Sequence, residues 1–216
     1  MTANADFLKE FIMKSIKKIF AVLSVLSLFV FAGCKSTKVQ RVDPDKQVDL
    51  SGYWNDTDVR IVAEELIKSC LESNAVKNYP SSHKGKQPVV IVGSFRNLSD
   101  EHIDTLILTK QFEAALINSG KVEFVSAASE REEIRAERLD QQDNASEETA
   151  KALRNETGAD FMLQGSIKTI VDSLDNKSTR TYYVTAELVD IETNKKLWME
   201  SNSSIKKIIT RSKNKF

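Results

Sequence analysis

Three segments in the last third of the chain alternate apolar and polar residues, and this alternation constrains the fold more than any other feature. A period of two is typical of strands that have one face in a core and the other in water. The "ETN" turn before the last segment is short, which favours antiparallel hairpins. The three segments are "FMLQGSIKTIV" (161–171), "TYYVTAELVDI" (181–191) and "KKLWMESNSSI" (195–205).

A helix and a buried strand are predicted ahead of these segments. Apolar residues at helical spacing predict a helix over residues 56–78, with Asp56 or Thr57 as its N-cap. A loop is predicted at 79–86. The next run, "PVVIVGSF" (88–95), is apolar without alternation, which is typical of a strand buried in the centre of a sheet.

A second helix is predicted over residues 101–118, with Ser99 or Asp100 as its N-cap and Gly120 as its end. A strand is predicted next, at 121–127, and a helix between two strands suits a right-handed crossover between parallel strands. Apolar residues lie on nearly all sides of this helix, so either two layers of the same domain or a partner protein would cover it. These residues are Ile103, Leu106, Ile107, Leu108, Phe112, Ala115, Leu116 and Ile117.

Two further helices are predicted in an acid-rich part of the chain. Ser129 and Glu132 have the spacing of a capping box and would begin a helix that ends near residue 141. Another helix would run over 146–158, because acidic residues in its first turn suit the helix dipole. The acids of residues 130–148 would form a solvated face or, alternatively, an acidic docking patch.

Together these elements predict a single α/β domain over residues 49–210. The predicted order is αβαβααβββ, with a mixed sheet of about five strands and helices packed on it. Residues 211–216 would form a basic tail, which would be solvated or would touch anionic headgroups or glycan strands.

The apolar run of residues 19–31 stops at "FAGC" and is too short to span a bilayer as a helix. Its length and the basic residues ahead of it are typical of a signal peptide, so we expect residues 1–33 to be removed, with Met13 as an alternative start. The small residues before Cys34 resemble the lipobox of bacterial lipoproteins. Cys34 would then carry diacylglycerol and acyl chains as the new N-terminus, and residues 34–48 would form a tether.

Neither catalysis nor nucleic-acid binding is indicated. With 31 basic and 31 acidic residues, the chain has no excess positive charge to attract a polyanion. Its two histidines have no cysteine or carboxylate at metal-ligand spacing, and no phosphate-binding loop or nucleophile elbow occurs. We therefore expect no catalytic residues, no metal, no small-molecule substrate and no cofactor apart from the lipid on Cys34. Cys70 would be a buried small hydrophobe on the helix over 56–78.

Several stretches after the predicted tether resemble one family of bacterial lipoproteins, the LpoB-like outer-membrane activators of penicillin-binding proteins. The first stretch is the most specific. "VGSFRN" and "ETNKKLW" are weaker, because TolB N-terminal domains and curli-secretion-type lipoproteins have similar elements. The stretches are "VDLSGYWNDTDVRIVAEELIKSCL" (48–71), "PVVIVGSFRNLSDEHIDT" (88–105), "KVEFVSAASE" (121–130), "GADFMLQGSI" (158–167) and "VDIETNKKLWMES" (189–201).

This resemblance implies a lipid-anchored, non-enzymatic protein on the periplasmic face of the outer membrane. It implies that the protein binds a bifunctional penicillin-binding protein, which is a peptidoglycan synthase, and stimulates its two reactions. Enterobacterial relatives have a long proline-rich tether, whereas about 15 residues here would span roughly 50 Å when fully extended. The alternative is a curli-secretion-like or TolB-like lipoprotein that acts as a structural or assembly component.

Two loops are candidates for the partner surface, namely "SGYWNDTD" before the first helix and "FRNLSD" after the first strand. Loops beyond the carboxyl ends of strands gather binding groups in open α/β sheets, and Trp and Arg are frequent hot spots. Alternatively, the aromatic residue of the first loop covers the core and its polar residues cap the helix. The candidate residues are Trp54, Asn55, Asp56, Phe95, Arg96 and Asn97.

Replacing Cys34 tests the predicted lipid anchor. Cys34→Ser removes the thiol that would accept the diacylglycerol, so we expect no fatty-acid labelling and an unprocessed or soluble protein in cells fed a labelled fatty acid. Cys70→Ser is the matched control and should leave the label in place. Persistent labelling of the Cys34→Ser protein would contradict the lipobox.

Overall fold

The computed structural model of the chain describes residue 13 and residues 38–43 and 46–212. Contacts divide the chain into two units, 1–44 and 45–216, and the fold below is that of the second unit. Cys34 and the predicted signal peptide, apart from Met13, lie outside the described residues. The elements are α2 (Asp56–Glu72), α3 (Asn74–Ser82), β1 (Val89–Asn97), α4 (Thr105–Ser119), β2 (Glu123–Phe124), α5 (Ala128–Asn144), β3 (Phe161–Leu174), β4 (Lys177–Asp190), β5 (Lys196–Asn202) and β6 (Lys206–Thr210).

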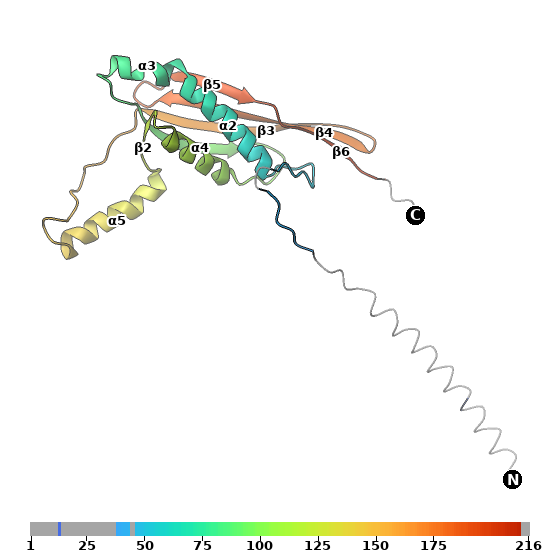
Figure 1. Cartoon of the computed structure of the whole chain (residues 1–216), viewed down its shortest axis with the longest axis horizontal. Coiled ribbons are helices and arrows are strands. Elements are labelled where there is room, and N and C mark those ends of the chain that lie inside the picture. The colour runs from blue at the N-terminus through green and yellow to red at the C-terminus, as the bar shows by residue number, and fades with distance from the viewer. Residues whose placement is uncertain (1–12, 14–37, 44–45, 213–216) are drawn as a thin grey trace, which may run out of the picture. The chain divides into compact units, whose positions relative to one another are not determined.

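The six strands form one mixed sheet in the order β2-β1-β3-β4-β5, and β6 pairs with β4 beyond the end of β5 (Figure 1). β1 is parallel to both β2 and β3, and the other pairs are antiparallel. The predicted mixed α/β sheet is therefore confirmed, with one strand more than expected. The extra strand arises because the predicted segment 195–205 ends early at Asn202, whose Oδ1 accepts from the backbone nitrogen and the hydroxyl of Ser204 and turns the chain.

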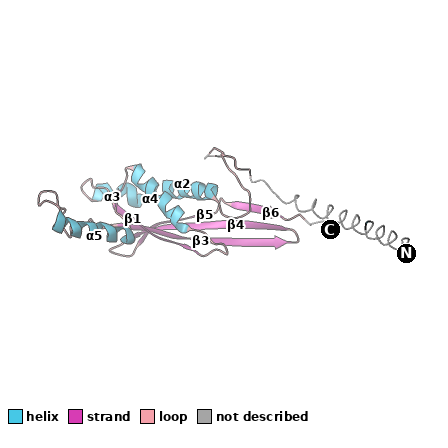
Figure 2. Ribbon diagram, turned by 90° about the horizontal axis from the view of Figure 1, so that it is seen from below, coloured by secondary structure: helices cyan, strands magenta, loops and turns pink. Residues whose placement is uncertain are grey.

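Helices α2 and α4 cover one face of this sheet and leave the opposite face open (Figure 2). The covered face consists of alternate residues of β3 and β4, as the period of two predicted. Leu163, Ile167, Tyr182, Val184 and Leu188 are at most 1% exposed. The core therefore lies between the sheet and these two helices.

The predicted helix over 56–78 is wrong in extent, because it is two helices. Ser73 has an extended backbone with ψ 151°, so α2 ends there. Its hydroxyl accepts from the backbone nitrogen of Val76 and begins α3, as serine often does where it competes with helical hydrogen bonds. The predicted loop 79–86 is also partly wrong, since α3 continues to Ser82.

Helix α4 begins later than predicted and is covered on one side only. Its N-cap is Asp104, whose carboxylate accepts from the backbone nitrogen of Leu106 at 2.9 Å, instead of Ser99 or Asp100. Gly120 ends it with φ 63°, as predicted. Of the two predicted alternatives, the described residues supply no second layer over its other side: Leu106, Ile107 and Ile117 remain 60%, 55% and 53% exposed.

The acid-rich part of the chain contains one helix instead of two. Glu130 begins α5 by accepting from the backbone nitrogen of Ala127, so the predicted Ser129–Glu132 capping box is wrong. Residues 146–158, all described, form turns and loop, with the backbone nitrogens of Thr149 and Ala150 bonded to the carbonyl of Ser146. None of the residues of α5 is buried, which leaves this acid-rich helix solvated.

The buried thiol of Cys70 offers a test of the α2 packing. Cys70 is 1% exposed, and burial raises its pKa to about 12, so the reactive thiolate is scarce in the folded protein. We expect a thiol reagent to label it slowly in buffer and rapidly in denaturant. Leu174→Cys, at a position that is 77% exposed, should label rapidly in both. Equal rates for Cys70 in the two conditions would place it on the wrong face of α2.

Candidate protein-binding surface

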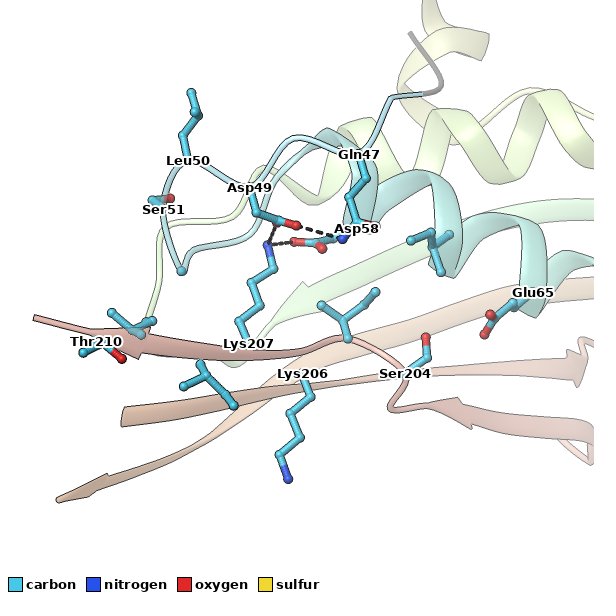
Figure 3. Close-up of a pocket in the computed structure, with 15 residues that line it drawn as sticks. Gln47, Asp49, Leu50, Ser51, Asp58, Glu65, Ser204, Lys206, Lys207 and Thr210 are labelled. Atoms are coloured by element: carbon cyan, nitrogen blue, oxygen red, sulfur yellow. Dashed lines mark hydrogen bonds and ion pairs between the residues drawn. The ribbon is translucent and has the colours of Figure 1, made fainter. Parts of the chain in front are cut away.

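The segment before α2 lies across β6 and closes a pocket with it (Figure 3). We call residues 47–54 the strap. Gly52 of the strap contacts Ile209, and a Cβ on this glycine would come within 2.0 Å of Ile209 Cγ1. The pocket between the strap, α2 and β6 has a volume of about 610 Å³.

Lys207 lines this pocket and holds the strap by an ion pair (Figure 3). Its Nζ lies 2.6 Å from Asp58 Oδ2 and 2.9 Å from Asp49 Oδ1, and it donates to the carbonyl of Tyr53 at 2.8 Å. Burial raises the pKa of Asp58, and Lys207 opposes that shift. Hydrogen bonds from Gln47 and then Lys207 lower the pKa of Asp49 to about 2. These charges are engaged in holding the chain together, so we do not assign the pocket to a ligand.

A second cluster ties the strap to the sheet through Glu101, whose side chain is 8% exposed. Tyr182 donates its hydroxyl proton to Glu101 Oε1 at 2.6 Å, and the backbone nitrogen of Trp54 donates to Oε2 at 3.0 Å. Arg180 Nη1 lies 2.5 Å from Glu101 Oε1 and 2.6 Å from Asp100 Oδ1. Asp100, predicted as a helix cap, thus pairs with Arg180 instead.

The first predicted loop has structural contacts at two of its three candidate residues. Trp54 is half-buried, and its ring centroid lies 5.1 Å from that of Tyr182. Asn55 is the N-cap of α2 and exchanges hydrogen bonds with Asp58. Asp56 is the first residue of α2 and is exposed. The structure therefore matches the alternative reading for Trp54 and Asn55, in which they cover the core and cap the helix.

The first three residues of the second predicted loop belong to β1, which continues to Asn97. Phe95 is 4% exposed and packs against Phe112 with ring centroids 4.7 Å apart. Asn97 donates its side-chain amide to the carbonyl of Glu101 at 2.7 Å. Arg96 is exposed and, by strand alternation, lies on the face opposite Phe95.

Arg96 is part of a shallow polar hollow of about 450 Å³ on the open face of the sheet. Glu187 also lines it: its Oε1 accepts from Gln164 Nε2 at 2.8 Å, and Lys196 Nζ lies 2.5 Å from its Oε2. The hydrogen bond from Lys196 is the largest effect that lowers the pKa of Glu187, and the hydrogen bond from Gln164 lowers it further. Both favour the ionised carboxylate. We call this set the Arg96 surface: Ser94, Arg96, Gln164, Ser166, Thr185, Glu187 and Lys196.

The six predicted candidates therefore do not form one site. Trp54 contacts Tyr182 on the helix-covered side of the sheet, whereas Arg96 faces the open side. Sequence reasoning missed Glu187 and Lys196 as neighbours of Arg96. The alternating pattern places Glu187 on a polar strand face, but the register that brings it to Arg96 is not visible in the sequence.

Two features are absent from the described residues. No group of three or more His, Cys, Asp or Glu residues there could hold a metal ion. No helix in that part of the chain is long and apolar enough to cross a membrane.

Comparison with known proteins identifies one family. The family model "Peptidoglycan-synthase activator LpoB" matches residues 58–204. Among solved structures, the LpoB C-terminal domain from Salmonella enterica is 17% identical, with 71% of this chain and 99% of that chain covered and a TM-score of 0.41. The LpoB C-terminal domain from Escherichia coli is 19% identical, with 67% of this chain and 96% of that chain covered and a TM-score of 0.41. Lipoprotein GNA1162 from Neisseria meningitidis is 20% identical, with 59% of this chain and 88% of that chain covered and a TM-score of 0.35. No curated protein matches.

Removing Lys207 tests the ion pair that holds the strap. Lys207→Met leaves Asp58, whose side chain is 4% exposed, without its cation, and breaking a buried pair from one side typically costs about 3–5 kcal/mol. We expect a loss of that order in the free energy of unfolding, measured by urea titration. Lys206→Met is the matched control, because Lys206 points away from the pocket (Figure 3), and it should change stability by less than about 0.5 kcal/mol.

The pH dependence of this variant gives a second readout. A raised pKa means that the folded state binds the proton of Asp58 more tightly than the unfolded state does, so protonation favours folding. Loss of Lys207 strengthens this effect, and the deficit of Lys207→Met should shrink as the pH falls below neutrality. A deficit that is the same at all pH values, or equal losses for the two lysines, would contradict a buried Lys207–Asp58 pair.

Proposed function

We propose, from the premise that the chain belongs to the LpoB family of peptidoglycan-synthase activators, that it is a non-enzymatic regulator that binds a bifunctional penicillin-binding protein. Acyl chains on Cys34 would hold it on the periplasmic face of the outer membrane. The observation that carries this proposal is the family match over 58–204, which spans the domain from α2 to the end of β5.

The Arg96 surface is the part of the domain that we assign to the synthase. It lies on the sheet face that the helices leave open, and its exposed Arg96 can bind a carboxylate with two parallel hydrogen bonds. Gln164 and Lys196 already contact the neighbouring Glu187. The carboxylate of Glu187 is therefore oriented before a partner binds. Arginines in such settings are frequent hot spots of interfaces.

Activation without catalysis requires a difference in affinity between two states of the synthase. A regulator that binds the active conformer more tightly than the inactive one shifts the population towards the active conformer. A tenfold shift requires about 1.4 kcal/mol of differential binding, which a few contacts on one surface can supply.

Reversing the charge of Arg96 tests this assignment. We expect Arg96→Glu to weaken binding to a purified bifunctional synthase by about 2 kcal/mol or more, as hot-spot substitutions do, and to reduce the stimulation of glycan polymerisation to the same extent. The thermal midpoint should barely move, since Arg96 is exposed.

Lys77→Glu is the matched control, because Lys77 is an exposed cation on α3 and away from the Arg96 surface. It should bind and activate as the unchanged protein does. Unchanged affinity of a folded Arg96→Glu protein would exclude the Arg96 surface. Failure of the unchanged protein to stimulate any bifunctional synthase of its own organism would reject the proposed function itself.

A further inference from the structure

The far end of the sheet extends beyond the helices as a three-stranded blade. We call it the distal blade: residues 168–174 of β3, residues 177–181 of β4, and β6 (Figure 1). The pairing of β1 with β3 ends at Ile167, and that of β5 with β4 begins at Val184, so neither reaches the blade. β6 pairs with β4 over 177–181 and completes it.

One face of the blade is apolar and exposed to an unusual degree. Ile170, Leu174 and Ile208 are 59%, 77% and 73% exposed. Ile170 and Leu174 lie on the same face of β3, because they are an even number of residues apart. Ile208 lies on this face as well, because it pairs with Thr179, which in turn pairs with Asp172 between Ile170 and Leu174. Three large exposed apolar side chains on one face of a projecting element indicate a contact surface.

Lysines surround these apolar residues on the same face. Lys177 pairs with Leu174, and Lys206 lies across Thr181 from Ile170. Lys168 precedes Ile170 by two residues, and all three lysines are exposed. Asp172 is the acidic residue on this face, so cations outnumber it three to one.

The basic tail leaves the domain at the tip of the blade. The backbone nitrogen of Arg211 donates to the carbonyl of Asn176 at 2.8 Å, and the side chain of Asn176 donates to the carbonyl of Arg211 at 3.1 Å. This pair of hydrogen bonds joins the end of the described chain to the turn between β3 and β4. Lys213 and Lys215 follow in the sequence, outside the described residues.

The chain that leads from Cys34 enters the domain beside the blade as well. The strap runs along β6, where Gly52 contacts Ile209 and Lys207 holds Asp49. About a dozen residues separate Cys34 from Gln47, which allows at most about 45 Å when fully extended. An acyl anchor on Cys34 would therefore hold Gln47, the first residue of the strap, within about 45 Å of the membrane surface.

We propose that the distal blade is a docking site for an anionic lipid surface. Ile170, Leu174 and Ile208 would lie at the level of the headgroups, where interfacial elements bury their apolar side chains, and the lysines would face anionic phosphates. This inference rests on the lipid anchor of the proposed function. The strap at β6, Arg211 at the turn of the blade and the lysines around the apolar face favour lipid over a protein partner.

Binding to vesicles of defined composition tests this docking site. The protein is the non-acylated chain of residues 45–216, which contains every buried apolar residue of the described core. We expect it to float with vesicles that contain phosphatidylglycerol and to bind them less as salt is raised, because the attraction is screened. Vesicles of phosphatidylcholine alone should bind it much more weakly.

Matched substitutions then locate the contact. Lys177→Ser and Lys206→Ser should each weaken binding to anionic vesicles about fivefold. Leu174→Asp together with Ile208→Asp should weaken it at least tenfold, whereas Leu106→Asp on α4, at a position 60% exposed, should leave it unchanged. Circular dichroism and the thermal midpoint check that each variant is folded.

Three results would overturn the docking site. They are absence of binding to anionic vesicles at low salt, equal losses for the Leu106 and blade variants, and blade-dependent binding to isolated peptidoglycan or to the synthase in place of vesicles. The vesicle assay contains no synthase and the activation assay contains no lipid vesicles. Failure of one inference therefore leaves the other standing.

Discussion

The arrangement of the domain depends on the hydrogen bonds and the ion pair that the buried carboxylate of Glu101 makes. It receives hydrogen bonds from Trp54 in the strap and Tyr182 in β4, and it pairs with Arg180. Its backbone carbonyl also accepts from Asn97. A carboxylate that is taken out of water requires such partners, because an unpaired buried charge costs several kcal/mol. Glu101 thereby connects the strap, β1, β4 and the loop before α4 and fixes their relative positions.

This junction, together with Lys207, determines which surfaces remain available. The strap is tied to the helix-covered side of the sheet by Trp54 and Asp49, so the strap itself does not cover the open face. Charges on the covered side are paired within the fold, as Arg180 and Lys207 show. The open face carries Arg96 and the exposed apolar residues of the distal blade, Ile170, Leu174 and Ile208.

The sequence predicted those parts of the fold that depend on local pattern. The alternation over 161–191 is the β3–β4 hairpin, and Gly120 ends α4 because a left-handed backbone favours glycine there. What could not be predicted depends on tertiary context. Ser73 divides a helix that periodicity alone would continue. Asp100 does not cap a helix, because its carboxylate pairs with Arg180, which is 80 positions away in the sequence.

The neighbours of Arg96 could not be predicted for a related reason. Arg96 meets Ser166 and lies beside Glu187 only because β1 shifts register between Val92 and Phe95. A shift of one residue exchanges the two faces of a strand, so the same sequence without the bulge would direct Arg96 into the core. The sequence shows which types of residue form the surface, but it does not show which of them are neighbours in the fold.

The Arg96 surface and the distal blade lie on the same face of the sheet, and this has a consequence for regulation. Ser166, the neighbour of Arg96, precedes Ile170 by four residues on β3, a distance of about 13 Å along a strand. A specific protein interface covers about 800 Å² on each partner, which is wide enough to reach from one surface to the other. Lipid and synthase would therefore compete for this face, and a synthase that binds Arg96 would lift the blade from the membrane.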